Sequence, residues 1–170
     1  WYAHHVARSD GKGCDQTLRG DWESMDRIFG NYSRYPREHL MKRFAPQGFD
    51  FVAVDGRFRD GCLAEAASLL KQDQPMLVRP DYGILLLDNA ERPEYQIAKD
   101  LPSHWLVVSF NSPVSETAIW MTCPTVDDVG CTAARIQIAE YMAKLPTNAV
   151  GRWYKSHMAR SKADGVPGIS

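Results

Sequence analysis

Polar side chains that suit ligand binding follow two short apolar runs of the chain. Residues 49 to 54 are followed at once by Asp55-Gly56, and residues 84 to 87 by Asp88-Asn89. In open parallel sheets ligands bind beyond the carboxyl ends of the strands, where such residues would lie. Two carboxylates and an amide would then converge on one site for a small polar ligand. The alternative is local turn chemistry, because Asp followed by Gly or Asn is common at strand ends.

The elements that must position these residues form a strand, a helix and a second strand. Between the two apolar runs, residues 62 to 71 carry Leu63, Ala66, Ala67 and Leu70 at helical spacing, which predicts one apolar helix face. A crossover of this kind joins parallel strands. If these strands are neighbours, their ends lie about 5 Å apart.

Three arginines and a tyrosine lie just beyond the predicted strand ends. Arg57, Arg59 and Arg92 are candidates for holding a carboxylate or phosphate of a substrate. Alternatively, they pair with the acidic residues beside them on the surface. Tyr95 is a candidate pocket residue, with packing as the alternative.

The remaining pattern predicts six more elements and a tail. We expect a helix over 36–44, a short helix around 95–98, and strands over 105–110 and 118–121 that form an antiparallel hairpin. Asp127 or Asp128 caps a last helix that runs to Lys144. A further helix is expected over 21–35. Residues 1–145 would form one α/β domain, and the glycines and prolines of 146–170 predict a flexible tail.

Composition narrows the classes of partner. The chain has 170 residues, 44% of them hydrophobic, and a formal charge of −1 from 20 basic and 21 acidic residues. This length supports one domain with a hydrophobic core. The near-neutral net charge produces no positive electrostatic field that would attract nucleic acid. No apolar run approaches the ~20 residues of a membrane helix. A small-molecule substrate is therefore the expected partner, and nothing indicates an oligomeric state.

Cysteine, histidine and serine patterns indicate no further chemistry. The four cysteines contain no CxxC pair, and Cys62 and Cys123 fall in or beside apolar elements, which favours free thiols and a reducing compartment such as the cytoplasm. The five histidines show no ligand spacing and are expected to be structural or solvated. No serine lies in a nucleophile-elbow pattern.

Two segments carry a resemblance to a known family. VDGRFRDGC (54–62) and GILLLDNAERPEY (83–95) are similar to the ends of the fourth and fifth strands of the class I S-adenosylmethionine-dependent methyltransferase domain. HWLVVSF (104–110) and TAIWMTC (117–123) would be its sixth and seventh strands. The resemblance covers roughly residues 36–123 and implies a Rossmann-like α/β sheet with parallel strands and a terminal antiparallel hairpin.

The resemblance also implies a cofactor and roles for the residues named above. Asp55 and Gly56 would lie against S-adenosylmethionine, and Asp55 and Asp88 would act in methyl transfer to an oxygen or nitrogen of a small molecule. Arg57, Arg59, Asn89, Arg92 and Tyr95 would hold the acceptor. Cation-dependent O-methyltransferases of the catechol type are similar at these strand ends, which implies a Mg²⁺ site at Asp55, Asp88 and Asn89.

One departure leaves a second function open. The family binds its cofactor with a glycine-rich turn after the first strand, and Gly11-Lys12-Gly13 follows no apolar strand. We therefore expect an incomplete methyltransferase sheet, as in the carboxyl part of a longer domain. The alternative function is a catalytically inactive binding or scaffolding module. A sugar-nucleotide transferase is a weaker fit, because no DxD run is present.

Overall fold

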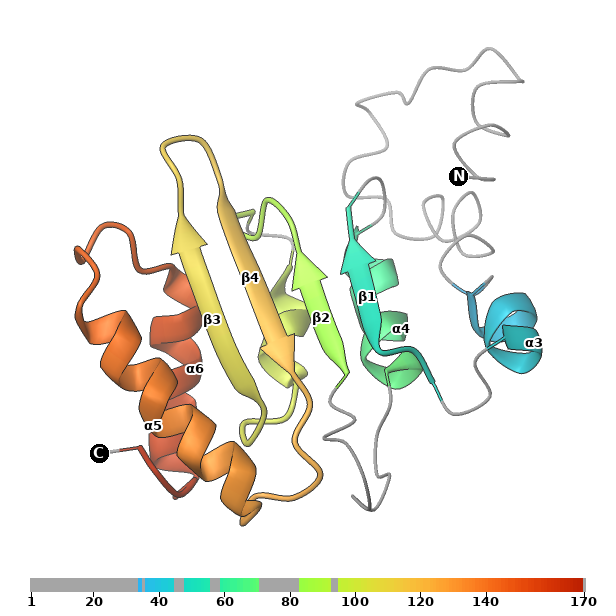
Figure 1. The fold of residues 1–170 in the computed structure, drawn as a ribbon. Helices are drawn as coiled ribbons and strands as arrows, with labels where there is room; N and C mark the ends of the chain where they lie inside the picture. Colours follow the sequence, from blue (N-terminus) through green and yellow to red (C-terminus); the bar gives the residue numbers. More distant parts are fainter. Residues whose placement is uncertain are drawn as a thin grey trace.

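The computed structural model describes residue 34 and residues 36–44, 48–55, 59–70, 83–92 and 95–169. Most of the helix predicted over 21–35 lies outside these residues. In chain order the elements are the π-helix η2 (Pro36–Met41), α3 (Lys42–Phe44), β1 (Phe51–Val54), α4 (Arg59–Leu69), β2 (Ile84–Leu87), the 3-10 helix η3 (Gln96–Asp100), β3 (Leu106–Asn111), β4 (Glu116–Met121), α5 (Val129–Ala143) and α6 (Arg152–Ala163) (Figure 1).

The described strands form one open four-stranded sheet in the order β1-β2-β4-β3. β1 and β2 are parallel neighbours, and β4 runs antiparallel to both β2 and β3. The last strand in sequence therefore lies between the second and the third. This confirms a mixed α/β fold with a parallel pair and a terminal hairpin.

The crossover between β1 and β2 forms because α4 has one apolar face. Leu63 and Ala66 of α4 and the adjoining Leu70 are buried, and they belong to one cluster with Leu85 and Leu87 of β2. A glycine lets α4 close onto β2, since a Cβ at Gly83 would lie 2.7 Å from the Leu70 Cβ. The predicted strand-helix-strand unit is confirmed.

The two faces of the sheet differ in how well they are covered. Leu85 and Leu87 of β2 are fully buried on the face that carries α4, whereas Ile84 and Leu86, which alternate with them along the strand, are half-buried. Phe51 of β1, the outermost strand of the described sheet on that side, shares the second face and is 53% exposed. In Figure 1, α4 lies behind β1, and α5 passes in front of α6 beside β3.

The segment predicted as a tail contains a packed helix. α6 spans Arg152–Ala163 and packs on β3, with Trp153, His157 and Ser161 buried. The Trp153 ring meets the Trp120 ring edge-on at a centroid distance of 6.0 Å. The predicted flexible tail is thus wrong for these residues. The prediction failed for two reasons. The glycines at 151 and 165 lie beside the helix and not within it, and the buried face of α6 has one aromatic residue and two polar ones.

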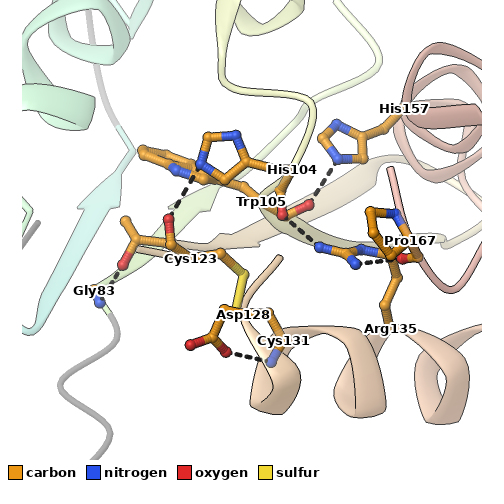
Figure 2. The surroundings of a disulfide bond; sticks show 10 residues. Gly83, His104, Trp105, Cys123, Asp128, Cys131, Arg135, His157 and Pro167 are labelled. Atoms are coloured by element: carbon orange, nitrogen blue, oxygen red, sulfur yellow. Dashed lines mark hydrogen bonds between the residues drawn. A yellow bond between two sulfur atoms is a disulfide. The ribbon is translucent and has the colours of Figure 1, made fainter. Parts of the chain in front are cut away.

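The hairpin and α5 are joined covalently. Cys123, just after β4, forms a disulfide with Cys131 in the first turn of α5, with Cα atoms 6.2 Å apart (Figure 2). The prediction of a free thiol is wrong for Cys123, because the segment between β4 and α5 brings Cys131, eight positions further along the chain, against it. Asp128 caps α5 as predicted, accepting a 2.7 Å hydrogen bond from the Cys131 N–H.

Side chains of α5 and α6 hold the loop before β3. His157 of α6 lies 2.8 Å from the Trp105 carbonyl through Nε2, and Arg135 of α5 donates to the His104 carbonyl at 2.8 Å (Figure 2). Arg160 donates to the Leu101 carbonyl. The pKa of His157 is lowered to about 4, mainly by burial and also by the charges of Arg160 and Arg135, while the hydrogen bond with the Trp105 carbonyl opposes the shift. His157 is therefore neutral and structural at neutral pH.

Candidate functional site

Asp55 and Asp88 lie at the same end of two neighbouring strands. β1 and β2 pair with Val54 opposite Leu87, and the Asp88 N–H donates to the Val54 carbonyl at 3.3 Å. Each acid directly follows its strand, so both leave the sheet at one level. Asp55 is exposed and Asp88 is half-buried. The sequence prediction of two acids at a shared edge therefore agrees with the strand register.

A tight turn follows Asp88 and sets the direction of the next residues. Asn89 has a positive φ of 52°, a conformation that Asn tolerates better than most residues other than Gly. The Arg92 N–H donates to the Asn89 carbonyl at 3.3 Å and closes the turn. The Arg92 side chain is exposed beyond it. The turn thus sets Asp88, Asn89 and Arg92 on one short segment, which we call the rim loop (residues 88–92).

A buried glutamate that the sequence did not single out joins this end of the sheet. Glu116 begins β4, which starts where β2 ends, and it is only 2% exposed. Its backbone is tied to the rim loop, because its carbonyl accepts from the Ala90 N–H at 2.6 Å and its N–H donates to the Glu91 carboxylate at 2.7 Å. Its own carboxylate accepts from the Trp153 N–H at 3.0 Å.

The first residues of α6 also bind the rim loop. Arg152 donates through Nη2 to the Ala90 carbonyl at 2.7 Å and to the Arg92 carbonyl at 2.9 Å, and its Nε lies 3.5 Å from the Glu116 carboxylate. The Trp153 indole N–H also donates to the Ala90 carbonyl, at 2.6 Å. The rim loop is therefore held by backbone and side-chain donors from both β4 and α6.

The other predicted site residues differ in how the structure places them. Tyr95 is 3% exposed and packs in the hydrophobic core, so the described structure gives its ring a packing position. Arg59 begins α4. Gly56 and Arg57 lie outside the described residues. Of the predicted site, the structure thus brings Asp55, Asp88, Asn89 and Arg92 to one end of the sheet.

The donor set at the strand ends suits a hard cation by type. Two carboxylates and an amide oxygen are the ligands that Mg²⁺ prefers, with waters completing its shell. Within the described ranges, no three His, Cys, Asp or Glu side chains form a group that could hold a metal ion. The predicted set of Asp55, Asp88 and Asn89 includes only two residues of these four types. The Mg²⁺ site therefore stays a prediction.

The comparisons with known proteins supply no relative. No protein-family model matches the chain, and no curated protein or solved structure matches it. Among the described residues, no helix has both the length and the apolar character needed to cross a bilayer.

Proposed function

We propose that this chain belongs to a class I S-adenosylmethionine-dependent methyltransferase and that transfer to an oxygen or nitrogen of a small molecule takes place at the carboxyl ends of β1 and β2. The observation that carries the proposal is the parallel register that sets Asp55 and Asp88 at one level. Ligands of open parallel sheets bind at this end.

The strand order supports the same proposal. β4 lies between β2 and β3 and runs against both. In the methyltransferase domain, the last strand likewise lies between its two predecessors and is antiparallel to them. The described sheet has the arrangement expected of strands four to seven of that domain.

The proposal assigns a task to each described rim residue. S-adenosylmethionine supplies the activated methyl group when bound, and Asp55, with Gly56 after it, would lie against it. Asp88 and Asn89 would orient the acceptor, directly or through Mg²⁺. Arg92, which is an exposed residue, would bind an anionic group of the acceptor. Arg57 and Arg59 stay candidates for the same task from sequence alone.

Calorimetric titration of the complete gene product with S-adenosylmethionine tests the proposal. We expect a saturable heat and a rise in Tm on addition of the cofactor. The titration is repeated with MgCl₂ and with EDTA, and a difference between the two would support the Mg²⁺ site. Absence of both heat and thermal shift would refute cofactor binding.

A second function, a binding module that keeps the fold without catalysis, is favoured by two observations. The printed sequence has no apolar strand followed by a glycine-rich turn, and Phe51 is 53% exposed on the less covered face of the sheet. An apolar side chain of that size on an edge strand suits contact with a partner. A folded protein that gives no heat with S-adenosylmethionine would favour this function.

A further inference from the structure

We infer that Arg152 is a positioning residue for the rim loop, held in place by Glu116. The inference rests on the proposed function for its catalytic consequence, but its structural part can be tested without any activity. Arg152 and Glu116 are 36 positions apart and come from different elements, α6 and β4, neither of which contains a predicted site residue.

Arg152 spans the rim loop with one side chain. Its Nη2 donates to the carbonyls of Ala90 and Arg92, which lie on either side of Glu91. These two contacts fix the backbone directly after Asp88 and Asn89. A planar guanidinium can serve two carbonyls and a carboxylate at once, which a lysine ammonium on a flexible stem does less well.

Glu116 determines where Arg152 lies. Its carboxylate is almost fully buried and is shared between the Trp153 N–H, at 3.0 Å, and Arg152 Nε, at 3.5 Å. A buried carboxylate needs such partners, because leaving it unpaired is costly. The Arg152 guanidinium also lies over the Trp153 ring, 5.4 Å from its centroid. Glu116 at Nε and the Trp153 ring at the guanidinium carbon thus help to fix the Arg152 side chain that contacts the rim loop.

The same helix end offers a matched control. Ser109 Oγ accepts from the Tyr154 N–H at 2.8 Å, so it caps the first turn of α6 as Glu116 does. Within the part of the chain that the structure describes, the hydrogen bonds of Ser109 go to the start of α6 and not to the rim loop. Ser109→Ala therefore weakens the helix end and leaves the contacts between Arg152 and the rim loop, whereas Arg152→Ala removes two of the hydrogen bonds that hold the rim loop and leaves both caps.

Hydrogen exchange by NMR on the full chain tests the structural part. We expect Arg152→Ala to speed exchange at the Ala90 and Arg92 amides at least tenfold relative to Ser109→Ala, with Arg152→Lys between Arg152→Ala and the wild type. Glu116→Gln keeps an acceptor for the Trp153 N–H and loses the charge that pairs with Arg152, so it should also speed exchange. Wild-type exchange rates in Arg152→Ala would overturn the inference.

Kinetics with S-adenosylmethionine test the catalytic part. Once an acceptor is found, we expect Arg152→Ala to lower kcat more than tenfold with little change in KM for the cofactor, partial recovery in Arg152→Lys, and near-normal kcat in Ser109→Ala. An unchanged kcat in Arg152→Ala would overturn the positioning role. A wild type that neither binds the cofactor nor transfers methyl refutes the proposed function instead, and the exchange result then stands alone.

Discussion

The backbone N–H of Asp88 donates to the carbonyl of Val54, and this hydrogen bond continues the parallel pairing of β1 and β2 one residue past the end of β2. It holds Asp88 at the level at which Asp55 leaves β1. The proposed site depends on this alignment more than on any other contact.

Asp88→Ala should lower methyl transfer roughly 100-fold or more, because the acceptor or its ion loses its positioning carboxylate. The fold should persist, since the hydrogen bond to Val54 is made by the backbone. Asp127→Ala is the charge-matched control, because Asp127 is an exposed acid in the segment between β4 and α5, away from the rim. Normal turnover in a folded Asp88→Ala protein would contradict the role of Asp88.

Gly151→Ala should destabilise the protein by roughly 1 to 3 kcal/mol through overpacking. A Cβ at position 151 would collide with Ser109 Oγ and with the Glu116 carboxylate, both of which cap α6. Urea unfolding measures the loss. In the double variant with Ser109→Ala, part of the loss should be recovered, because one of the colliding atoms is gone. Strict additivity would count against the predicted collision.

Removing the disulfide should lower the free energy of unfolding by about 2 to 3 kcal/mol, the value for a short closed loop. The Cys123→Ser, Cys131→Ser protein is compared with wild type in urea, with and without dithiothreitol. Reductant should destabilise the wild type and leave the double variant unchanged. Cys62→Ser is the control, because Cys62 is not part of a disulfide. If dithiothreitol leaves the free energy of unfolding of the wild type unchanged, the prediction is contradicted.

Acid should destabilise the protein through His157. Its pKa in the folded state is about 4, below the ordinary histidine value of 6.5, so the unfolded chain binds the proton more readily. The contribution of His157 to the free energy of unfolding is therefore fully present above pH 6.5 and falls by about 3 kcal/mol as the pH drops to 4. Urea unfolding at several pH values measures the slope.

His157→Gln supplies the control for the acid effect. Its side-chain amide can still donate to the Trp105 carbonyl but does not titrate. We expect a shallower fall of stability between pH 6.5 and 4 in this variant. An identical slope in the two proteins would assign the acid effect to other groups.

The local elements could be predicted from the sequence because their apolar residues follow helix and strand periods. Leu63, Ala66 and Leu70 marked α4, and Asp128 marked the start of α5. α6 was missed because its buried face is Trp153, His157 and Ser161, three residues at a spacing of four with only one apolar member. Those polar residues are buried because they bond carbonyls of the loop before β3, which no local pattern reveals.

The candidate site was likewise predicted only in part from the sequence. Asp55 and Asp88 were found because they end apolar strands, and their alignment follows from the parallel crossover. Glu116 and Arg152 were not found, since one begins a strand and the other begins a helix in the supposed tail. Only the three-dimensional order, with β4 beside β2, places them at the rim.

The position of β4 also bears on how the chain is made. As the chain leaves the ribosome, β1 and β2 are complete before any residue of β4 exists, and β2 must wait for β4 to pair its second edge. Until then the second edge of β2, an apolar strand, presents open backbone groups. Co-translational folding should therefore be delayed until the hairpin has emerged, and chaperones that recognise exposed apolar segments have that interval in which to bind.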